Sequence, residues 1–563
     1  MNFFLTILLL VACLALTWRF LGSYMAAVYE GRVSFLGWLE RPTYRLLGVD
    51  PQREQSWQRY AGALIVYSGV AILLLYGMFR LQGSLPGNPA HLGAVAPALS
   101  WNTAVSFVTN TNWQNYSGES TMSYLSQMGA LAVQNFVSAS VGIAVAIALV
   151  RGLVRRESST IGNFWVDLVR GIYYVLLPIS IVFAVIFVAE GAIQTLAGPV
   201  SVHDALNGVH QVIPRGPFAS QEVIKQLGTN GGGSYNANGA MPFENPTGLT
   251  NFISVFLILT IPISLTYTFG KMVGNVRQGV ALLAAMTILF GVWLGVATYA
   301  ESQGNPAVAA AGVKHQPGGN MEGKESRFGY SQSTLYNIVS TQTSTGSVDS
   351  ANDSYTPIGG MMLLSGMMLG EVTPGGVGSG LYTILVFAII AVFLGGLMVG
   401  RTPEYLGKKI QSREVKLAAL AALVMPITVI VLTAIASALP AGRAGALNAG
   451  PHGFTEILYA FTSQGNNNGS AFAGLNGNTA FYNISGAIAM LLGRFAIIVP
   501  VLALAGVLAG KQVVAASAGT FRTDTPLFTG LVIGVIIIIG ALTFFPAVSL
   551  GPIVEQLIHG RFF

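Results

Sequence analysis

Four stretches of the chain combine residues whose oxygen atoms could surround a cation. The most distinctive reads GTNGGG, from Gly228 to Gly233, and is too rich in glycine to form a helix. Similar stretches rich in Thr, Ser, Asn and Gly lie within residues 102–118, 333–354 and 454–474, each after a short, partly apolar segment. Glycine permits backbone conformations that turn successive carbonyl oxygens to one side. Rings of carbonyl oxygens can replace the hydration shell of an ion, so the four loops are predicted to converge on one cation.

The predicted ligands are backbone and side-chain oxygens of these loops. They are Thr109, Asn110, Thr111, Asn112 and Gln114 in the first loop, Thr229, Asn230, Gly231, Gly232 and Gly233 in the second, Thr343, Ser344, Thr345 and Gly346 in the third, and Ser463, Gly465, Asn466, Asn467, Asn468 and Gly469 in the fourth. The helix before each loop would point its partially negative C-terminal end at the ion.

Carboxylates are sparse in the loops. Glu119, Asp349 and Asp353 are the nearest ones, and all three lie beyond the predicted ligands. A divalent ion would require several carboxylate ligands. We therefore expect a monovalent cation, with K⁺ ahead of Na⁺ by analogy with potassium channels.

The elements that must hold the loops are strongly apolar. The chain has 563 residues, of which 52% are hydrophobic and 9% are charged, against about 25% charged in soluble domains. Apolar runs long enough to cross a bilayer as helices occur near residues 2–18, 61–82, 129–150, 167–189, 251–269, 279–299, 380–400, 415–438, 483–508 and 527–547. The sequence predicts an all-α polytopic membrane protein with about ten transmembrane helices, and it excludes a soluble globular fold.

The distribution of basic residues predicts the orientation of the chain. Nineteen of the 28 Lys and Arg residues fall in the short segments 19–60, 151–170, 271–277, 401–416 and 511–522, whereas the longer alternate connections hold few. Basic loops favour the cytoplasmic side. We expect the four loops and both termini on the outer side of the membrane. Because no Lys or Arg precedes the first apolar run, we expect a retained span and no signal peptide.

The polar loops recur in a regular order. Each lies between two apolar runs, which indicates a fourfold internal repeat over residues 61–150, 166–270, 278–400 and 415–510. Residues 1–60 would add a first span and a basic cytoplasmic segment, and residues 511–563 would add a last span. Irregular backbone at membrane depth must be buried in protein or line a wet cavity. Re-entrant pore loops fit this order better than four ordinary outer loops.

Few charges lie within or beside the apolar runs. Arg494 falls inside the ninth run, while Glu371 and Arg401 flank the seventh. Charges in a membrane are candidates for a functional role. Arg494 could line the ion path or could hydrogen-bond loop carbonyls structurally, and Glu371 is more consistent with a loop position.

The chain lacks the motifs of several enzyme classes. The chain has no GxxxxGK[ST] phosphate loop, no HExxH helix and no DKTGT sequence, and GGVGSG (375–380) precedes a membrane span instead of a βαβ unit. One cysteine, Cys13, excludes a disulfide framework, and all six histidines lie outside the apolar runs. We expect no catalytic centre and no ATP binding in this chain, and an electron-transfer or proton-pumping subunit is disfavoured.

Five motifs resemble one known family. They are VTNTNWQNYSGE (108–119), GTNGGGSYNANGAMPFENPT (228–247), GEVTPGGVGSGLY (370–382), GRTPEYLGKKI (400–410) and TSQGNNNGSAFAGL (462–475). In this order they resemble the potassium-binding A subunits of bacterial Kdp-type potassium-transporting ATPases, over essentially the whole chain.

The resemblance implies a fold like that of the potassium channel and Trk/Ktr/HKT superfamily, with four membrane–pore–membrane repeats and one extra helix at each end. It also implies a complex in the bacterial inner membrane, in which a P-type ATPase B subunit hydrolyses ATP and small C and F subunits assist. K⁺ would be the transported ion, selected at the four loops. Arg401 and the GRTPEYLGKK loop would face the cytoplasmic coupling region, and Glu371 and Arg494 would line the pore or take part in coupling.

A stand-alone channel or uptake protein of the Trk/Ktr type is the alternative function, since it would share the pore loops without an ATPase partner. Two departures qualify the resemblance to channels. No loop reads TVGYG, and the third loop, TSTGSV, has the least glycine. Channel-like conduction is therefore not implied.

Overall fold

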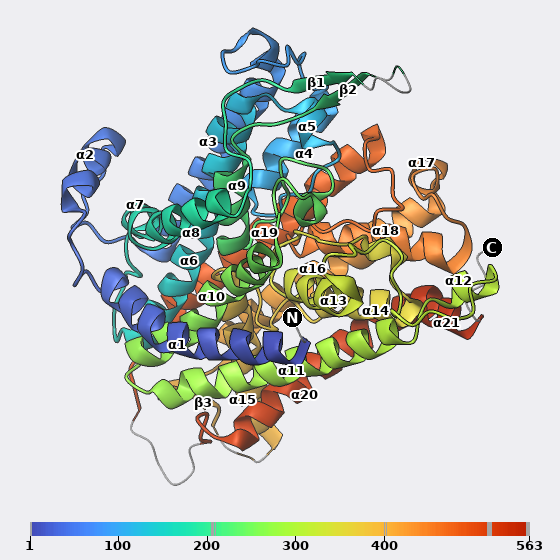
Figure 1. Cartoon of the computed structure of the whole chain (residues 1–563). Coiled ribbons are helices and arrows are strands. Elements are labelled where there is room, and N and C mark those ends of the chain that lie inside the picture. Colours follow the sequence, from blue (N-terminus) through green and yellow to red (C-terminus); the bar gives the residue numbers. More distant parts are fainter. Residues whose placement is uncertain are drawn as a thin grey trace.

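The computed structural model describes residues 3–203, 208, 210–398, 400, 402–514 and 521–558. Ten helical segments in this part of the chain are long and apolar enough to cross a membrane. They are α1 (Phe3–Tyr29), α3 (Trp57–Leu81) with η1 (Gln82–Ser84), η2 (Ser126–Ala132) with α6 (Val133–Val154), α7 (Phe164–Arg170) with η3 (Gly171–Leu176) and α8 (Leu177–Ala189), α10 (Gly248–Met272), α11 (Val276–Ser302) with α12 (Pro306–Ala310), α15 (Ser379–Met398), α16 (Ser412–Ala438), α19 (Ala480–Ala509), and α20 (Pro526–Val548) with η6 (Ser549–Ile553) and α21 (Val554–Leu557). This confirms the predicted all-α polytopic fold (Figure 1).

Shorter elements connect the long helices. Four of them precede the polar loops: α4 (Pro97–Val108), α9 (Phe218–Leu227), α13 (Gly329–Thr341) and α18 (Gly450–Gly465). The others are α2 (Gly37–Leu47), α5 (Gly118–Thr121), η4 (Asn238–Ala240), η5 (Asn352–Ser354), α14 (Pro357–Met368), α17 (Pro440–Arg443), and the antiparallel pairs β1 (Val200–His203) with β2 (His210–Ile213) and β3 (Glu404–Tyr405) with β4 (Lys408–Lys409).

The same three-part arrangement occurs four times: α3–α4–α6, α8–α9–α10, α11–α13–α15 and α16–α18–α19. In each set the second long helix is the inner one. In their most apolar stretches, α6, α10, α15 and α19 have 83, 78, 67 and 61% of residues buried, against 33, 28, 33 and 39% for the first helices of the four sets. The exposed apolar side chains of the outer helices suit contact with lipid. α1 packs on α10, and α20 packs on α11 and α15.

The inner helix of the third set is broken. α14 ends at Met368, and the glycine-rich segment 369–378 precedes α15. This segment lies directly against α6, because a Cβ atom at Gly142 would lie 2.3 Å from the carbonyl oxygen of Val377. The Val377 amide also donates to the Thr229 hydroxyl at 2.9 Å. The segment that resembled a nucleotide loop therefore packs beneath the second polar loop.

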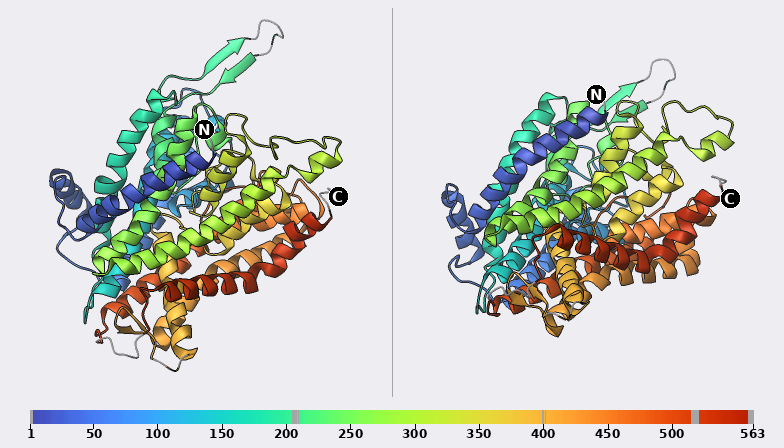
Figure 2. Two further views of the ribbon diagram at one scale, coloured as in Figure 1. Left: turned by 60° about the horizontal axis from the view of Figure 1, so that its bottom comes forward. Right: turned by 90° about the horizontal axis from the view of Figure 1, so that it is seen from below.

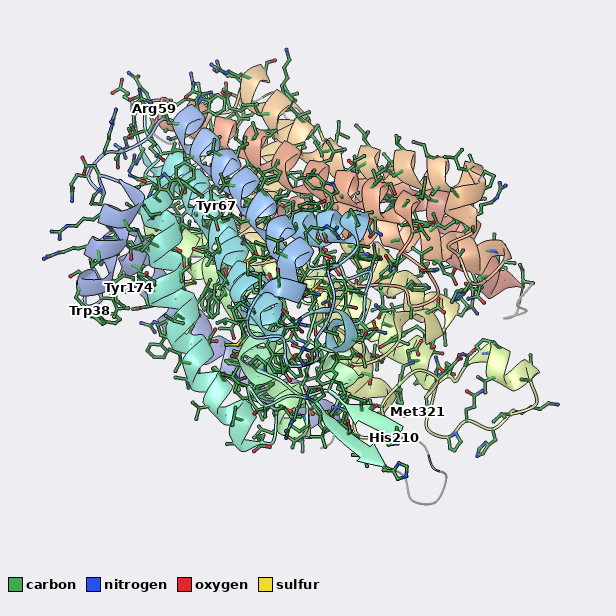
Figure 3. All side chains as sticks on the ribbon, turned by 90° about the horizontal axis from the view of Figure 1, so that it is seen from above. Trp38, Arg59, Tyr67, Tyr174, His210 and Met321 are labelled. Carbon is green, nitrogen blue, oxygen red and sulfur yellow. The ribbon has the colours of Figure 1, made fainter. Side chains whose placement is uncertain are left out.

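The two ends of the bundle differ in composition. Arg59 and Trp38, from the basic segment after α1, lie at the opposite end from His210 and Met321, which belong to the long connections (Figure 3). The β1–β2 hairpin projects beyond the helices at the latter end (Figure 2). This separation agrees with the charge distribution used to predict the orientation. Arg401 lies outside the described residues.

Lys408 joins the basic ends of two inner helices. Its buried ammonium donates hydrogen bonds to the carbonyls of Gly152 (2.8 Å) and Leu508 (2.6 Å), and to that of Arg155. These carbonyls belong to the last turns of α6 and α19, where helical carbonyls lack intrahelical partners and the dipole favours a cation. The GRTPEYLGKK segment therefore ties the first and fourth sets together.

We expect Lys408→Met to lower the thermal unfolding midpoint of the purified protein in detergent by several degrees. The reason is that hydrogen bonds from a charged donor contribute about 1.5–3 kcal/mol, and three acceptors would be left without it. Lys409→Met is the matched control, because the Lys409 side chain is exposed. Equal midpoints for the two variants would contradict the capping role.

Candidate functional site: a ring of four loops

The four short helices end in the same hydrogen-bond pattern. A backbone amide of the loop returns to a carbonyl in the last helical turn: Thr111 to Ser106, Asn230 to Lys225, Thr345 to Ser340 and Asn468 to Ser463. These bonds define equivalent positions in four stretches of little sequence identity. They also bring each loop back over the C-terminal end of its helix.

Two further positions share an unusual conformation. The residue before each of these amides has positive φ, as does the residue after it. The pairs are Asn110 (64°) and Asn112 (55°), Thr229 (45°) and Gly231 (69°), Ser344 (52°) and Gly346 (82°), and Asn467 (57°) and Gly469 (93°). Positive φ is uncommon outside glycine, and Asn tolerates it best among the other residues. The shared alternation explains why these loops are rich in Asn and Gly.

Glycine also permits the loops to touch. A Cβ atom at Gly231 would lie 1.8 Å from the carbonyl oxygen of Thr345, one at Gly346 would lie 2.3 Å from that of Asn468, and one at Gly469 would lie 1.9 Å from that of Thr111. The second loop thus contacts the third, the third contacts the fourth, and the fourth contacts the first. The first and second loops are joined by side chains: the Gln114 amide donates to Gly233 O at 2.9 Å and accepts from Gly233 N at 3.0 Å. The loops form a closed ring.

The ring carries free carbonyl oxygens. Thr111, Asn230, Thr345 and Asn468 are all buried. Within the part of the chain that the structure describes, no hydrogen-bond donor contacts their backbone carbonyl oxygens. Buried carbonyls are nearly always paired in proteins. A ring of buried carbonyls without donors is suited to binding a dehydrated cation.

Side-chain amides fix the loops from behind. The Asn110 amide donates to Thr229 O at 3.1 Å, and Asn230 donates to the Asn110 amide oxygen. The Asn467 amide donates to the Thr111 hydroxyl at 2.9 Å. Asn side chains thus connect adjacent loops instead of holding each loop open separately.

Two predicted ligands lie outside the ring. Ser463 and Gly465 belong to the last turn of α18, because this helix continues further than its polar sequence suggested. The Ser463 hydroxyl accepts a hydrogen bond from Gly469 N at 3.0 Å, so it supports the loop. The hydroxyls of Thr109 and Thr343 bond to helix carbonyls and to Thr111 and Thr345 respectively, at the inner end of the loops.

The ring separates two cavities. The outer one, about 350 Å³, is lined by residues of all four loops, including Asn112, Gly232, Gly346 and Gly469. The inner one, about 60 Å³, is lined by Ser344, Asn466 and Asn467 together with residues of α15, α16, α19 and α20. An ion passing through the ring would move from a polar outer vestibule into this smaller space.

Asp349, which follows the third loop, is one of the carboxyl groups near the ring. Burial raises the pKa of Asp349 to about 8, although hydrogen bonds from Ser350 and Asn251 act in the opposite direction. Burial therefore favours the neutral form of this carboxyl. None of the predicted ligands in the four loops is a carboxylate, whereas a divalent cation would require several.

Glu371 and Arg494 both line the inner cavity and are 3% and 4% exposed. Glu371 lies in the loop between α14 and α15, as the sequence suggested. Its carboxyl group accepts a hydrogen bond from the Asn468 side chain at 2.9 Å, so it lies directly beneath the ring. Arg494 donates to Ser138 O at 3.0 Å. Its acceptor belongs to α6 and not to a polar loop.

Several supporting residues carry no distinctive sequence signal. Ser106, Lys225 and Ser340 look like ordinary helix residues, and Ser138 looks like part of a span. The shared hydrogen bonds define their positions. A serine lies four residues before the first positive-φ residue in three of the four loops, and an alignment of the loops would show it.

The fold and the site define a polytopic helical membrane protein in which four re-entrant loops surround one candidate cation site. Residues 7–557 match the family described as potassium-transporting ATPase A subunit, and the chain belongs to this family. It is 55% identical to a potassium-transporting ATPase potassium-binding subunit of Mesorhizobium japonicum, covering 100% of both chains. A protein of the same description from Granulibacter bethesdensis is 56% identical over 98% of both chains, and one from Herpetosiphon aurantiacus is 55% identical over 96% of both.

Two neighbouring glycines provide a test of the ring. Gly231 and Gly232 both have positive φ (69° and 70°), but a Cβ at Gly232 would lie no closer than 3.1 Å to its nearest neighbour, Asn112 O. Alanine costs about 1–2 kcal/mol at either position through the backbone alone. We expect Gly231→Ala to abolish the thermal stabilisation of the protein by KCl relative to NaCl, whereas Gly232→Ala retains it. Loss in both variants, or in neither, would contradict the close loop contact.

Proposed function

We propose that this chain is the potassium-binding and translocating, non-hydrolytic subunit of an ATP-driven potassium uptake complex. One observation carries the proposal: buried carbonyls that accept no hydrogen bond from the described residues recur at equivalent positions of four loops, between an outer and an inner cavity. The relatives described as potassium-binding subunits identify the ion. The repeat boundaries 61–150, 166–270, 278–400 and 415–510 are part of this proposal.

The ring contributes ligands in layers. Backbone oxygens of Thr111, Asn230, Thr345 and Asn468 form the central layer, which the positive-φ residues on either side orient. Thr109 and Thr343 would contribute at the inner end, while Gln114, which lines the outer cavity, and its partner Gly233 would contribute at the outer end. Replacing water by fixed carbonyls allows binding without a net ionic charge on the protein, which suits a monovalent ion.

Transport requires energy from another chain. K⁺ would enter the outer vestibule, cross the ring and leave the inner cavity toward a P-type ATPase B subunit. C and F subunits would complete the complex in the bacterial inner membrane, and both termini of this chain would lie on the outer side. This chain would bind no ATP. Arg401 and the segment around Lys408, at the basic end, would face the coupling region.

The stand-alone Trk/Ktr-type function is less consistent with these findings, because the family of this chain consists of ATPase subunits. The test is purification of this chain from cells that also make a P-type ATPase. Co-purification with a P-type ATPase, and ATP hydrolysis stimulated by K⁺, would support the pump. K⁺ conduction by this chain alone, without ATP, would refute it.

We expect Gly232→Asp to weaken K⁺ selection in the assembled complex. The carboxylate would add charge and volume beside Asn112 O and the Gln114 amide, 3.1 and 3.3 Å from the new Cβ. The apparent affinity for K⁺ should fall by about tenfold, with a changed ranking of K⁺, Rb⁺ and Na⁺ in ATPase stimulation. An unchanged affinity and ranking would remove Gly232 from the site.

We expect Arg494→Gln to reduce K⁺ uptake about tenfold or more while the complex still assembles, since a buried charge acts strongly on an ion in a low-dielectric cavity. The control is Arg443→Gln, because Arg443 is exposed on α17. Normal uptake by the Arg494 variant would assign this residue a structural role only.

A further inference from the structure

One of the four supporting positions breaks the pattern of the others. The helix residue whose carbonyl receives the loop amide is Ser106 in the first unit, Ser340 in the third and Ser463 in the fourth. In the second unit it is Lys225. Lysine at this position is completely buried in α9.

Two of the three serines support their loops by hydrogen bonds, whereas the Ser340 hydroxyl is buried and has no hydrogen-bond partner among the described residues. The Ser106 hydroxyl donates to Trp113 O at 2.9 Å, and the Ser463 hydroxyl accepts from Gly469 N at 3.0 Å. Each hydroxyl therefore fixes the outer part of its own loop. A lysine side chain reaches further and carries a charge that must be compensated when buried.

Two carboxylates compensate this charge. Lys225 forms ion pairs with Glu222, one turn earlier in α9, and with Glu244, whose Oε2 lies 3.0 Å from Nζ. The ammonium lies directly behind the last glycine of the loop, because a Cβ atom at Gly233 would lie 2.9 Å from Lys225 Nζ and 3.0 Å from Glu244 Oε2. We call Glu222, Lys225 and Glu244 the buried triad.

The buried triad holds loop backbone on one side and the Gln226 side chain on the other. Glu244 Oε1 accepts from Ser234 N at 2.7 Å and from Tyr235 N at 3.2 Å, so it fixes the two residues after the glycines. Glu222 Oε1 accepts from Gln226 Nε2 at 2.8 Å, and the same nitrogen lies 3.0 Å from the Ser347 hydroxyl of the third loop. The triad thus connects the second loop to the third.

The second loop has the greatest need for this support. Gly231, Gly232 and Gly233 have no side chains that could anchor the backbone, and glycine loses more conformational freedom on ordering than any other residue. In the other units, the residue two positions after the ring carbonyl has a side chain. It is Trp113, Ser347 or Ser470. The triad substitutes for the missing side chains.

We propose that Glu222, Lys225 and Glu244 form a positioning group that sets the geometry of the second loop and thereby the discrimination between K⁺ and Rb⁺. This inference rests on the proposed function of the ring. Carbonyls distinguish ions of different radius only while their positions, number and orientation are maintained. If the triad is removed, the second loop relaxes and the ring accommodates the larger ion more readily.

The test measures ATPase stimulation of the assembled complex by K⁺ and by Rb⁺, for Lys225→Met and for the charge-matched Lys225→Met/Glu222→Gln variant. The double variant removes one positive and one negative charge, so the formal net charge of the triad stays the same, although Glu244 loses its ion-pair partner. We expect the apparent K⁺ affinity to fall about tenfold, a change of ~1.4 kcal/mol, and the ratio of Rb⁺ to K⁺ affinity to rise in both variants. The maximal rate should change much less than the affinity.

The matched control is Lys324→Met. Lys324 forms an equally buried ion pair with Glu301, at 2.8 Å, in the outer connection of the third unit. Its loss should lower the stability of the complex without altering the Rb⁺ to K⁺ ratio. The same change of ratio in this control would attribute the effect to general destabilisation and overturn the inference.

The remaining outcomes are distinct. If the unmodified complex does not respond to K⁺, the proposed function fails. If it responds but the triad variants keep its ion ranking, only the positioning role fails. Glu244→Gln, which keeps the acceptor oxygen and the side-chain volume, serves if the lysine variants do not assemble. Failure of all three variants to assemble would assign the triad to folding and would also overturn the inference.

Discussion

The contact between a glycine of one loop and a carbonyl oxygen of the next is the constraint on which this structure depends. A Cβ atom at Gly231, Gly346 or Gly469 would lie about 2 Å from that oxygen, far inside any allowed contact. The loops can therefore approach closely only where a side chain is missing. This approach brings buried carbonyls from four distant parts of the sequence into one ring, and the surrounding helices maintain it.

Such a ring is costly to build inside a membrane protein. Each buried carbonyl without a donor costs free energy unless a ligand replaces water. The structure limits this cost where Asn and Gln side chains donate to other loop carbonyls, as Asn110 does to Thr229 O and Gln114 to Gly233 O. It also places the C-terminal ends of α4, α9, α13 and α18 next to the ring, where their dipoles favour positive charge. A cation bound at the ring would compensate its unpaired carbonyl oxygens.

The sequence predicted the ten spans and the four loops because both leave strong local patterns. Long apolar runs reflect the lipid solvent around a helix, and clusters of Gly and Asn reflect the local backbone conformation. Both patterns can be recognised from neighbouring residues alone. The extent of α18 was predicted less well, since Ser463 and Gln464 look like loop residues while the buried surroundings keep them helical. The break between α14 and α15 and the buried triad depend on contacts between distant residues, for example Val377 with Gly142 and Lys225 with Glu244. No local pattern encodes these contacts.

The four loops belong to one polypeptide, and this connectivity affects how the site can vary. In an assembly of identical subunits, every substitution would be applied four times around the axis. A buried lysine beside the ring would then bring three more ammonium groups, and their mutual repulsion would oppose the binding of any cation. A single chain can place Lys225 in one quarter and serine in the other three. Each quarter is therefore free to mutate separately, and selectivity can be adjusted in small steps.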